Sequence, residues 1–149
     1  MAIKSYLKLT KDERNRLKRA QKGSMDTEDI ETAIRIYEKM NRPHRAAYYA
    51  EQLAEKTRII DDYRRVFRLL ISDGSCLAAA RLAREKNLNH EAKDLYEKAI
   101  YNLEILGRIT DAYQVALEKA ALTGDEKDNK RAKELDGLAA IYYSPMILC

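Results

Sequence analysis

The feature that most constrains the fold of this chain is a repeated helical periodicity of its apolar residues. Between residues 89 and 107 the sequence reads NHEAKDLYEKAIYNLEILG, and its apolar side chains recur every three or four residues. Such spacing places them on one stripe of an α-helix that packs against a core. Gly107 follows the last apolar position, where a glycine in the left-handed conformation commonly ends a helix. The stretch is therefore predicted to be an amphipathic helix.

The same spacing recurs along the rest of the chain. It predicts further helices near residues 27–41, 43–56, 58–72, 75–86, 109–122 and 126–143. Another helix is expected within the segment 1–22, where Thr10 and Glu13 have the spacing of a capping box. The chain contains only 5 Gly and 2 Pro, too few turn residues for a β-sandwich or barrel. The predicted fold class is therefore all-α, with about seven or eight helices.

Consecutive helices are joined by short loops, which makes them antiparallel neighbours. The sequence can be aligned with itself in two ways. One shift places Tyr63 on Tyr96 and matches two glycines, and we call it the longer shift. A second shift, the shorter one, places Ala54 on Ala83. These shifts predict three helical hairpins, over residues 27–56, 58–86 and 90–122. An ordinary helical bundle also repeats apolar residues at helical spacing. The aligned glycines and the alanine-rich second helices favour a repeat, because small side chains let helices approach closely.

Hairpins with this pattern resemble the tetratricopeptide (TPR) family of helical repeats, and the related α-solenoids of clathrin and coatomer type. In the stretch 73–106, the small and aromatic positions of the family are matched by Ala83, Ala92, Tyr96 and Ala99. The repeats are degenerate, since no Trp stands at the first signature position and no Pro closes each repeat. The resemblance implies hairpins stacked as a short TPR-like α-solenoid, a right-handed superhelix whose concave groove binds peptides or proteins.

The length of 149 residues suits a single helical-repeat domain. Its expected parts are a basic helical segment over 1–22, the three hairpins over 27–122, and a C-terminal helix with an apolar tail over 126–149. From Leu138 onward the chain carries no charged side chain. We expect this tail to cap the open end of the solenoid, or to form the contact of a homodimer.

The expected location is the cytoplasm. The two cysteines, Cys76 and Cys149, are isolated in sequence, which argues against a disulfide framework or a zinc site. No apolar run has the length of a membrane span, and no signal-peptide core follows the first basic residues.

The resemblance places the partner-binding groove along the first helix of each hairpin. The outward basic residues of these helices are the candidates for this contact: Arg35, Lys39, Arg64, Arg65 and Arg68. Arginine offers a planar fork of donors that fits a carboxylate of a peptide or protein partner. The alternative interpretation is that these charges are only solvated.

The segment 1–22 concentrates the positive charge of the chain. It holds eight basic and two acidic side chains, a net charge of +6, whereas the whole chain has +4. Six of these bases are candidate contacts to the phosphates of a nucleic acid: Lys8, Lys11, Arg14, Arg16, Lys18 and Arg19. Phosphate contact needs only such a cluster, and an anionic membrane is a related target. The alternative is an amphipathic first helix that keeps its charges in water.

No arrangement of residues in the sequence indicates catalysis. His44 and His90 lie far apart without the spacing of a metal site, and no glycine-rich phosphate loop is present. The sequence therefore predicts a protein that is not an enzyme, with no metal and no cofactor, acting as a scaffold that binds a peptide or protein partner. The alternative is an RNA- or DNA-associated helical protein that uses the N-terminal bases.

Overall fold

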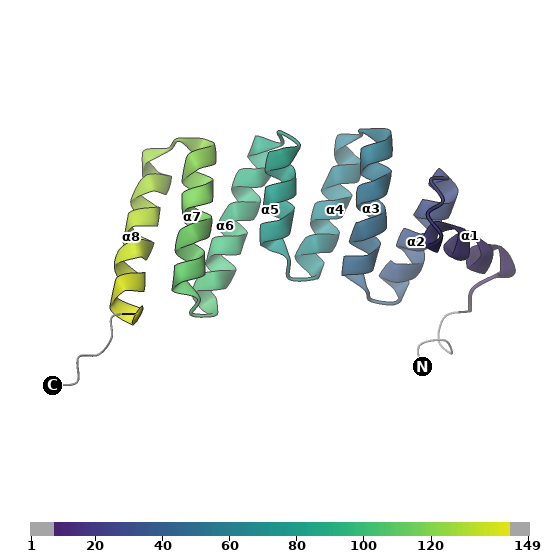
Figure 1. The fold of residues 1–149 in the computed structure, drawn as a ribbon, viewed down its shortest axis with the longest axis horizontal. Coiled ribbons are helices and arrows are strands. Elements are labelled where there is room, and N and C mark those ends of the chain that lie inside the picture. Colours follow the sequence, from purple (N-terminus) through teal and green to yellow (C-terminus); the bar gives the residue numbers. More distant parts are fainter. Residues whose placement is uncertain (1–7, 144–149) are drawn as a thin grey trace. The chain divides into compact units, whose positions relative to one another are not determined.

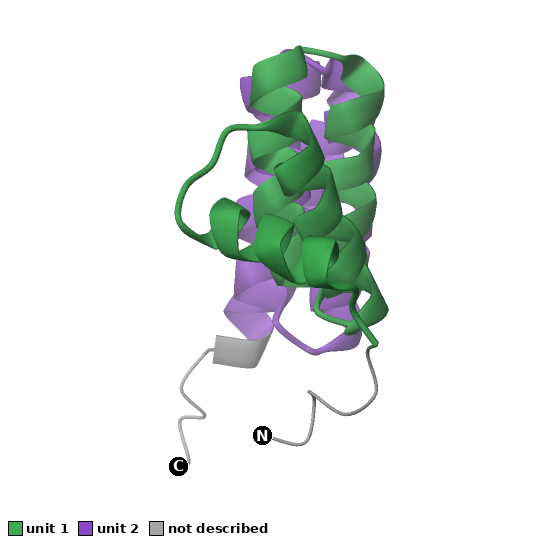
Figure 2. Cartoon of the chain, turned by 90° about the vertical axis from the view of Figure 1, so that its right-hand side faces the viewer, with its two compact units in different colours: residues 1–75 green, residues 76–149 purple. Residues whose placement is uncertain are grey.

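The computed structural model describes residues 8–143, and all of the regular structure in this part of the chain is α-helical (Figure 1). Its eight helices are α1 (Lys11–Gln21), α2 (Thr27–Lys39), α3 (Pro43–Thr57), α4 (Ile60–Ser72), α5 (Cys76–Glu85), α6 (Asn89–Ile105), α7 (Ile109–Thr123) and α8 (Glu126–Tyr143). The all-α prediction and the expected number of helices are confirmed. The chain divides into two compact units, unit 1 over residues 1–75 and unit 2 over residues 76–149 (Figure 2).

Unit 1 has α3 packed against both α2 and α4. The inward face of α3 consists of Ala46, Ala50 and Ala54, which follow one another at one-turn spacing and are almost completely buried. These small side chains allow the neighbouring helices to lie close to α3. Ile30 and Ile34 of α2 have no exposed surface, and burial of each stabilises the unit by about 2 kcal/mol.

Local signals determine where the helices of unit 1 begin. The predicted capping box forms: the Glu13 amide donates to Thr10 Oγ1 at 3.1 Å, and the Thr10 amide donates to Glu13 Oε2 at 2.9 Å. Asp26 accepts from the first amides of α2, and Pro43 lies in the first turn of α3. A proline is well tolerated there because the first amides of a helix have no intrahelical acceptor.

Unit 2 has α6 packed between α5 and α7, and α7 packed against α8. Tyr96 of α6 and Leu135 of α8 are its largest completely buried side chains. The neighbouring faces of α5 and α7 again carry small residues, among them Ala79, Ala83 and Ala112, none of which is exposed. Unit 2 is therefore built in the same way as unit 1, with alanine-rich helices lying between larger apolar side chains.

The second helices of the hairpins begin at equal intervals along the chain. α3, α5 and α7 begin at Pro43, Cys76 and Ile109, and each step equals the longer shift that places Tyr63 on Tyr96. The shorter shift, inferred from Ala54 and Ala83, is therefore wrong for the helix starts. The two shifts differ by about one helical turn, so both keep apolar residues in phase and periodicity alone does not separate them.

Helices α2–α4 of unit 1 correspond to α6–α8 of unit 2 at twice the longer shift. This doubled shift, which we call the unit offset, places both the first and the last residue of α3 on those of α7, and the first residue of α4 on that of α8. The turns before α4 and α8 also repeat one side-chain hydrogen bond. Thr57 Oγ1 donates to Asp62 Oδ2 at 2.5 Å, and Thr123 Oγ1 donates to Asp128 Oδ2 at 2.5 Å. The repeat thus extends to the polar residues that fix the turns.

The first and third predicted hairpins, 27–56 and 90–122, correspond to α2–α3 and α6–α7, each inside one unit. The middle hairpin, 58–86, contains α4 and α5, which belong to different units. The single domain and the superhelix therefore stay predictions. The C-terminal helix is present as α8, and the last part of the predicted cap, residues 144–149, lies outside the described residues.

Candidate functional site

A surface pocket of unit 1 lies between the loop that precedes α2 and the outer face of α3. Its volume is about 470 Å³, and it is lined by Met25, Tyr48, Glu51, Gln52, Glu55 and Lys56. Met25 and Tyr48 are 55% and 60% exposed, so the pocket presents a thioether and an aromatic ring to solvent. Its volume falls within the range of ligand pockets, roughly 300–1,000 Å³.

Helical spacing places four of the lining residues on one face of α3. Tyr48, Glu51, Gln52 and Glu55 follow one another in steps of three, one and three positions, which keeps them within an arc of about 100°. This face points away from the alanines that pack into unit 1. The opposite wall is fixed by Lys56, whose Nζ donates to the carbonyl oxygen of Met25 at 2.5 Å. The α3 face and the loop are therefore tied together beside the pocket.

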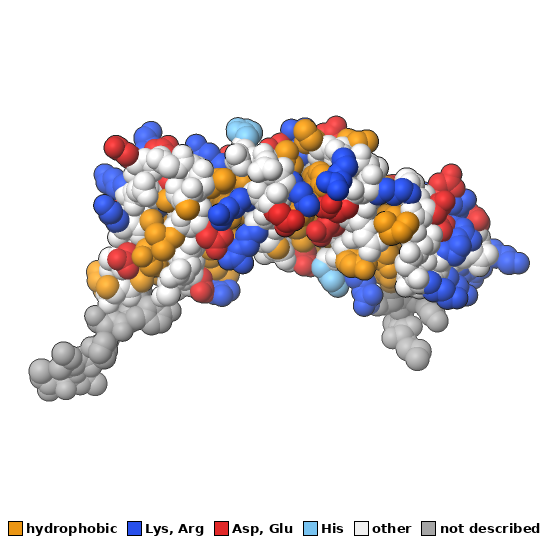
Figure 3. All heavy atoms as spheres, turned by 45° about the horizontal axis from the view of Figure 1, so that its top comes forward, with side chains coloured by type: hydrophobic (Ala, Val, Ile, Leu, Met, Phe, Trp, Pro, Cys, Tyr) orange, Lys and Arg blue, Asp and Glu red, His pale blue; other side chains and the backbone are white. Residues whose placement is uncertain are grey.

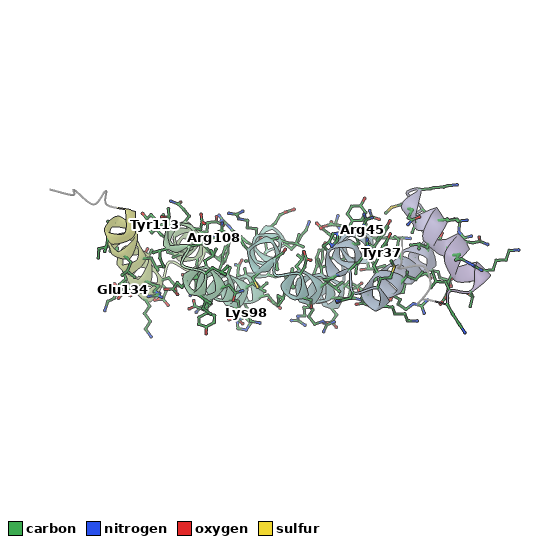
Figure 4. The ribbon with its side chains drawn as sticks, turned by 90° about the horizontal axis from the view of Figure 1, so that it is seen from below. Tyr37, Arg45, Lys98, Arg108, Tyr113 and Glu134 are labelled. Carbon is green, nitrogen blue, oxygen red and sulfur yellow. The ribbon has the colours of Figure 1, made fainter. Side chains whose placement is uncertain are left out.

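A cluster of aromatic rings adjoins the pocket through Tyr48. Tyr49 is buried and stacks on Tyr37 of α2, with ring centroids 5.7 Å apart and an interplanar angle of 7°. Tyr48 meets Tyr49 edge-on, at 5.1 Å and 81°. The guanidinium of Arg45 lies 5.9 Å from the Tyr37 ring centre on the same side of the unit (Figure 4). Burial raises the pKa of Tyr49, so its phenol stays neutral.

The chemistry of the pocket suits a cationic group carried on an apolar stem. Glu51 and Glu55 supply two carboxylates beside the exposed Tyr48 ring, and each already interacts with another group of the chain. The one basic lining residue, Lys56, donates to the backbone. An aromatic face attracts a cation, and carboxylates accept charge-assisted hydrogen bonds from it.

Sequence reasoning missed this pocket. The available signal was an aromatic residue, Tyr48, on the polar face of a helix, with Glu51 and Glu55 three and seven positions later. The contribution of Met25 depends on how the preceding loop folds back on α3, which no spacing in the sequence shows.

The predicted arginine cluster of α4 does not act as one group. Arg65 turns toward α2, and its Nη1 donates to both carboxylate oxygens of Glu31 at 2.8 and 2.9 Å. Its Nη2 lies 3.5 Å from Glu38. Arg64 pairs with Asp61, one turn earlier on α4, at 3.0 Å. Arg65 thus uses its donor fork to join two helices of unit 1.

The other predicted contact residues remain at the surface. Arg35 donates to Thr32 Oγ1 at 3.4 Å. Lys39 and Arg68 are exposed, with no side-chain partner among the residues that the structure describes. A role of these residues in partner binding stays a prediction.

The six predicted phosphate contacts fall into two groups at the N-terminal end of unit 1. Arg16 and Arg19 face α2: Arg16 Nη1 lies 2.5 Å from Glu28 Oε2, and Arg19 donates to both oxygens of Asp29 at 2.9 to 3.2 Å. Asp29 is buried, and the Arg19 guanidinium lowers the pKa of its carboxyl group. The remaining four, Lys8, Lys11, Arg14 and Lys18, are exposed and have no side-chain partner within the described range 8–143.

Unit 2 encloses a lysine in its interior. Lys119 of α7 is 8% exposed and pairs with Glu97 of α6 and, at 2.8 Å, with Asp128 of α8. Burial works against the charge of Lys119, but the hydrogen bonds to the two carboxylates outweigh it and raise its pKa. Burial opposes ionisation of Asp128 as well, yet donation from Lys119 and Thr123 lowers its pKa. The group is a satisfied ion-pair network that joins three helices.

A second polar network of unit 2 is centred on Glu118. Arg81 of α5 donates to both of its oxygens, at 2.6 and 3.1 Å, and the buried Tyr96 hydroxyl donates at 3.1 Å. The Arg81 guanidinium is the main cause that lowers the pKa of Glu118. This network joins α5, α6 and α7.

Exposed apolar side chains gather on one side of unit 2. Lys98 of α6 and Glu134 of α8 project on the same side of this unit (Figure 4). Tyr101 follows Lys98 by three positions and Leu138 follows Glu134 by four, so both lie on that side as well. Tyr101 and Leu138 are exposed. The predicted homodimer contact through the C-terminal segment stays a prediction.

The structure brings neither histidine into a reactive group. His44 Nδ1 lies 3.9 Å from Asp73, and His90 Nε2 lies 3.9 Å from Asp94. Within residues 8–143 no three His, Cys, Asp or Glu side chains are placed so that they could hold a metal ion. Over the same range, no helix has the length and hydrophobicity needed to cross a membrane.

Comparison with known proteins finds no matching family model, no matching curated protein and no matching solved structure.

Proposed function

We propose that this protein is a non-enzymatic, cytoplasmic interaction module that binds a segment of a protein partner in the pocket of unit 1. The observation that carries the proposal is the exposed pair Met25 and Tyr48 above a pocket that contains two carboxylates. Large apolar side chains exposed together in a concave, partly polar setting are typical of docking surfaces.

The proposed ligand is a peptide segment with a lysine or arginine beside an apolar residue. The apolar part would lie on Met25 and Tyr48, and the cation would meet Glu51 and Glu55. The whole chain carries a net charge of +4, so a basic peptide is repelled by the molecule on average. Binding of such a peptide therefore requires local carboxylates, and the peptide cation would compete with the groups that Glu51 and Glu55 already contact.

The helical hairpins support the same proposal. Pairs of helices at equal intervals along the chain, with alanines where helices approach, resemble TPR-like repeats, and we place the protein in that class as part of the proposal. A rigid helical frame keeps the side chains of α3 in fixed positions, which lowers the entropic cost of binding.

The test is fluorescence anisotropy with a labelled peptide whose Lys and Leu residues lie on opposite faces of a helix. A second, charge-reversed peptide has Glu in place of each Lys. We expect the lysine peptide to bind and the glutamate peptide not to bind. The variant Tyr48→Ala should weaken binding about tenfold or more, the loss expected for an aromatic anchor.

Tyr101 provides a matched control. It is 63% exposed, against 60% for Tyr48, and lies in unit 2. Tyr101→Ala should leave the affinity unchanged. Equal losses in the two variants, or no loss in Tyr48→Ala, would contradict the proposed site. The double variant Glu51→Gln, Glu55→Gln should reduce the preference for the lysine peptide over the glutamate peptide.

A further inference from the structure

Helix α1 has two chemically different sides. The side toward α2 holds Ala20, which is the buried residue of this helix, and the arginines Arg16 and Arg19 that pair with Glu28 and Asp29. The other side faces solvent. α1 is thus joined to α2 by these ion pairs and by a hydrogen bond that Gln21 Nε2 donates to the Tyr37 hydroxyl at 3.1 Å, and Ala20 is its contribution to the core.

The solvent side of α1 is a stripe of basic residues. Lys11, Arg14, Lys18 and Lys22 are all exposed and have no side-chain partner in the described part of the chain. At about 100° per residue they fall within an arc of about 80°, and along the helix they extend over about 16 Å. We call these four residues the α1 stripe. Figure 3 shows Lys and Arg side chains gathered over the end of unit 1 that holds α1.

The acidic residues of α1 do not neutralise the stripe. Asp12 accepts from Arg16 Nε at 2.8 Å, and Glu13 is used in the capping box with Thr10. Both lie outside the arc of the stripe. Two of the six bases named from the sequence, Arg16 and Arg19, therefore anchor α1, whereas Lys22 joins the exposed set.

The residues around the α1 stripe favour one kind of partner over the others. An amphipathic helix that lies on a membrane needs large apolar residues to insert beside its bases. A protein interface needs an apolar centre within a polar rim. None of the exposed large apolar side chains of the described residues lies on α1. A phosphodiester backbone requires only positive charges spaced along a line.

We propose that the α1 stripe binds the phosphodiester backbone of a nucleic acid, without reading its base sequence. Lys11, Arg14, Lys18 and Lys22 contact phosphates, and the ion pairs of Arg16 and Arg19 with α2 hold the helix in place. This site is separate from the pocket that Met25 and Tyr48 line. A negative result for nucleic-acid binding would therefore leave the proposal of peptide binding in the pocket unaffected, and the reverse also holds.

The test measures binding of a fluorescein-labelled oligouridylate by anisotropy over a range of salt concentrations. Four phosphate contacts to a single strand predict a slope of log Kobs against log salt of about −3. The variant with Lys11, Arg14, Lys18 and Lys22 all replaced by Gln should lose binding on the order of 100-fold near physiological salt. Its slope should be clearly shallower, because only Lys8 of the exposed candidates keeps its charge. Gln is a good helix former and the anchors are retained, so α1 should stay folded.

The charge-matched control removes four exposed lysines of unit 2 instead: Lys98, Lys127, Lys130 and Lys133, each replaced by Gln. None of them has a side-chain partner in residues 8–143. This variant should keep most of the affinity and the salt slope. Equal losses in both variants would mean that only net charge matters and would overturn the proposal. So would no binding of the oligouridylate by the wild type, or binding of phosphatidylserine vesicles in its place.

Discussion

Helices α2–α4 of unit 1 and α6–α8 of unit 2 have the same arrangement but differ in the side chains between them. At the unit offset they share two carboxylates of the first helix and an arginine of the third: Glu31 and Glu97, Glu38 and Glu104, Arg65 and Arg131. In unit 1, Arg65 pairs with Glu31 and Glu38. In unit 2, Arg131 pairs with Glu104 and Glu134.

The two units also differ at one interior position. Leu53 of α3 is 5% exposed, and the residue that corresponds to it in α7 is Lys119, 8% exposed. Lys119 pairs with Glu97, the counterpart of Glu31. Arg131 keeps the pair with Glu104 and adds one with Glu134, where unit 1 has Arg68. The same arrangement of helices thus holds an apolar side chain at this position in unit 1 and an ion-paired lysine in unit 2.

The surfaces of the units differ more than their interiors. Residues 1–75 contain 17 basic and 12 acidic side chains, a net charge of +5, and residues 76–149 contain 11 and 12, a net charge of −1. Arg35 and Lys39 of α2 correspond to Tyr101 and Ile105 of α6. We infer that the units serve different contacts, with both proposed ligand sites on unit 1.

The largest effect is expected from removing the interior lysine. Lys119→Leu gives unit 2 the residue that unit 1 has, but it leaves Asp128 buried without its cation. The free energy of unfolding should fall by about 3 kcal/mol. Adding Asp128→Asn should recover most of the loss, because the uncompensated charge is then gone. Urea unfolding followed by circular dichroism measures both. An unchanged midpoint for Lys119→Leu alone would show that the buried carboxylate of Asp128 does not depend on Lys119.

A smaller effect is expected from pH. The folded pKa of Glu118 lies below its ordinary value of 4.5, mainly because of Arg81. The ionised carboxylate therefore contributes stability that is fully present above pH 4.5 and is lost as the pH falls toward the folded pKa. The Tm of the wild type should drop between pH 6 and pH 3, and Glu118→Gln should reduce that drop. Parallel pH profiles of the two proteins would contradict the role of this carboxylate.

The smallest effect is expected at the corresponding turns. Arg58 and Gly124 end α3 and α7 in the left-handed conformation, with φ of 59° and 64°. Gly124→Ala should cost about 1 kcal/mol, because a side chain is strained there although no atom obstructs it. In Arg58→Gly, relief of strain stabilises the folded chain, whereas the greater freedom of the unfolded chain works against folding. The free energy of unfolding should therefore change by no more than about 0.5 kcal/mol. A larger loss in Arg58→Gly than in Gly124→Ala, measured by urea unfolding, would show that the turns are not equivalent.

The helices could be predicted from the sequence because the buried face of each helix requires apolar residues at a regular spacing. The capping box at Thr10 and the helix at Asn89–Ile105 are examples of such local information. The register of the first hairpin could not be predicted, since the shorter and the longer shift keep the same helical phase.

The sites were harder to predict because they depend on contacts between distant residues. Arg65 is an outward arginine by spacing, yet its acceptor Glu31 lies 34 residues earlier. Arg14 and Arg16 look equivalent in sequence, and only the packing of α1 on α2 separates the solvent-facing base from the anchor. The identity of the contact residues is thus a tertiary property.

The proposed peptide-binding site lies on unit 1, and its position can be tested residue by residue. The most direct measurement is an amide ¹H–¹⁵N correlation spectrum of the full chain, titrated with the lysine–leucine peptide. We expect saturable shifts at Met25 and along the outer face of α3, around Tyr48 and Glu55, with α6 and α8 unchanged. Shifts that centre instead on Tyr101 and Leu138 of unit 2 would contradict it and would place the docking surface on the apolar side of that unit.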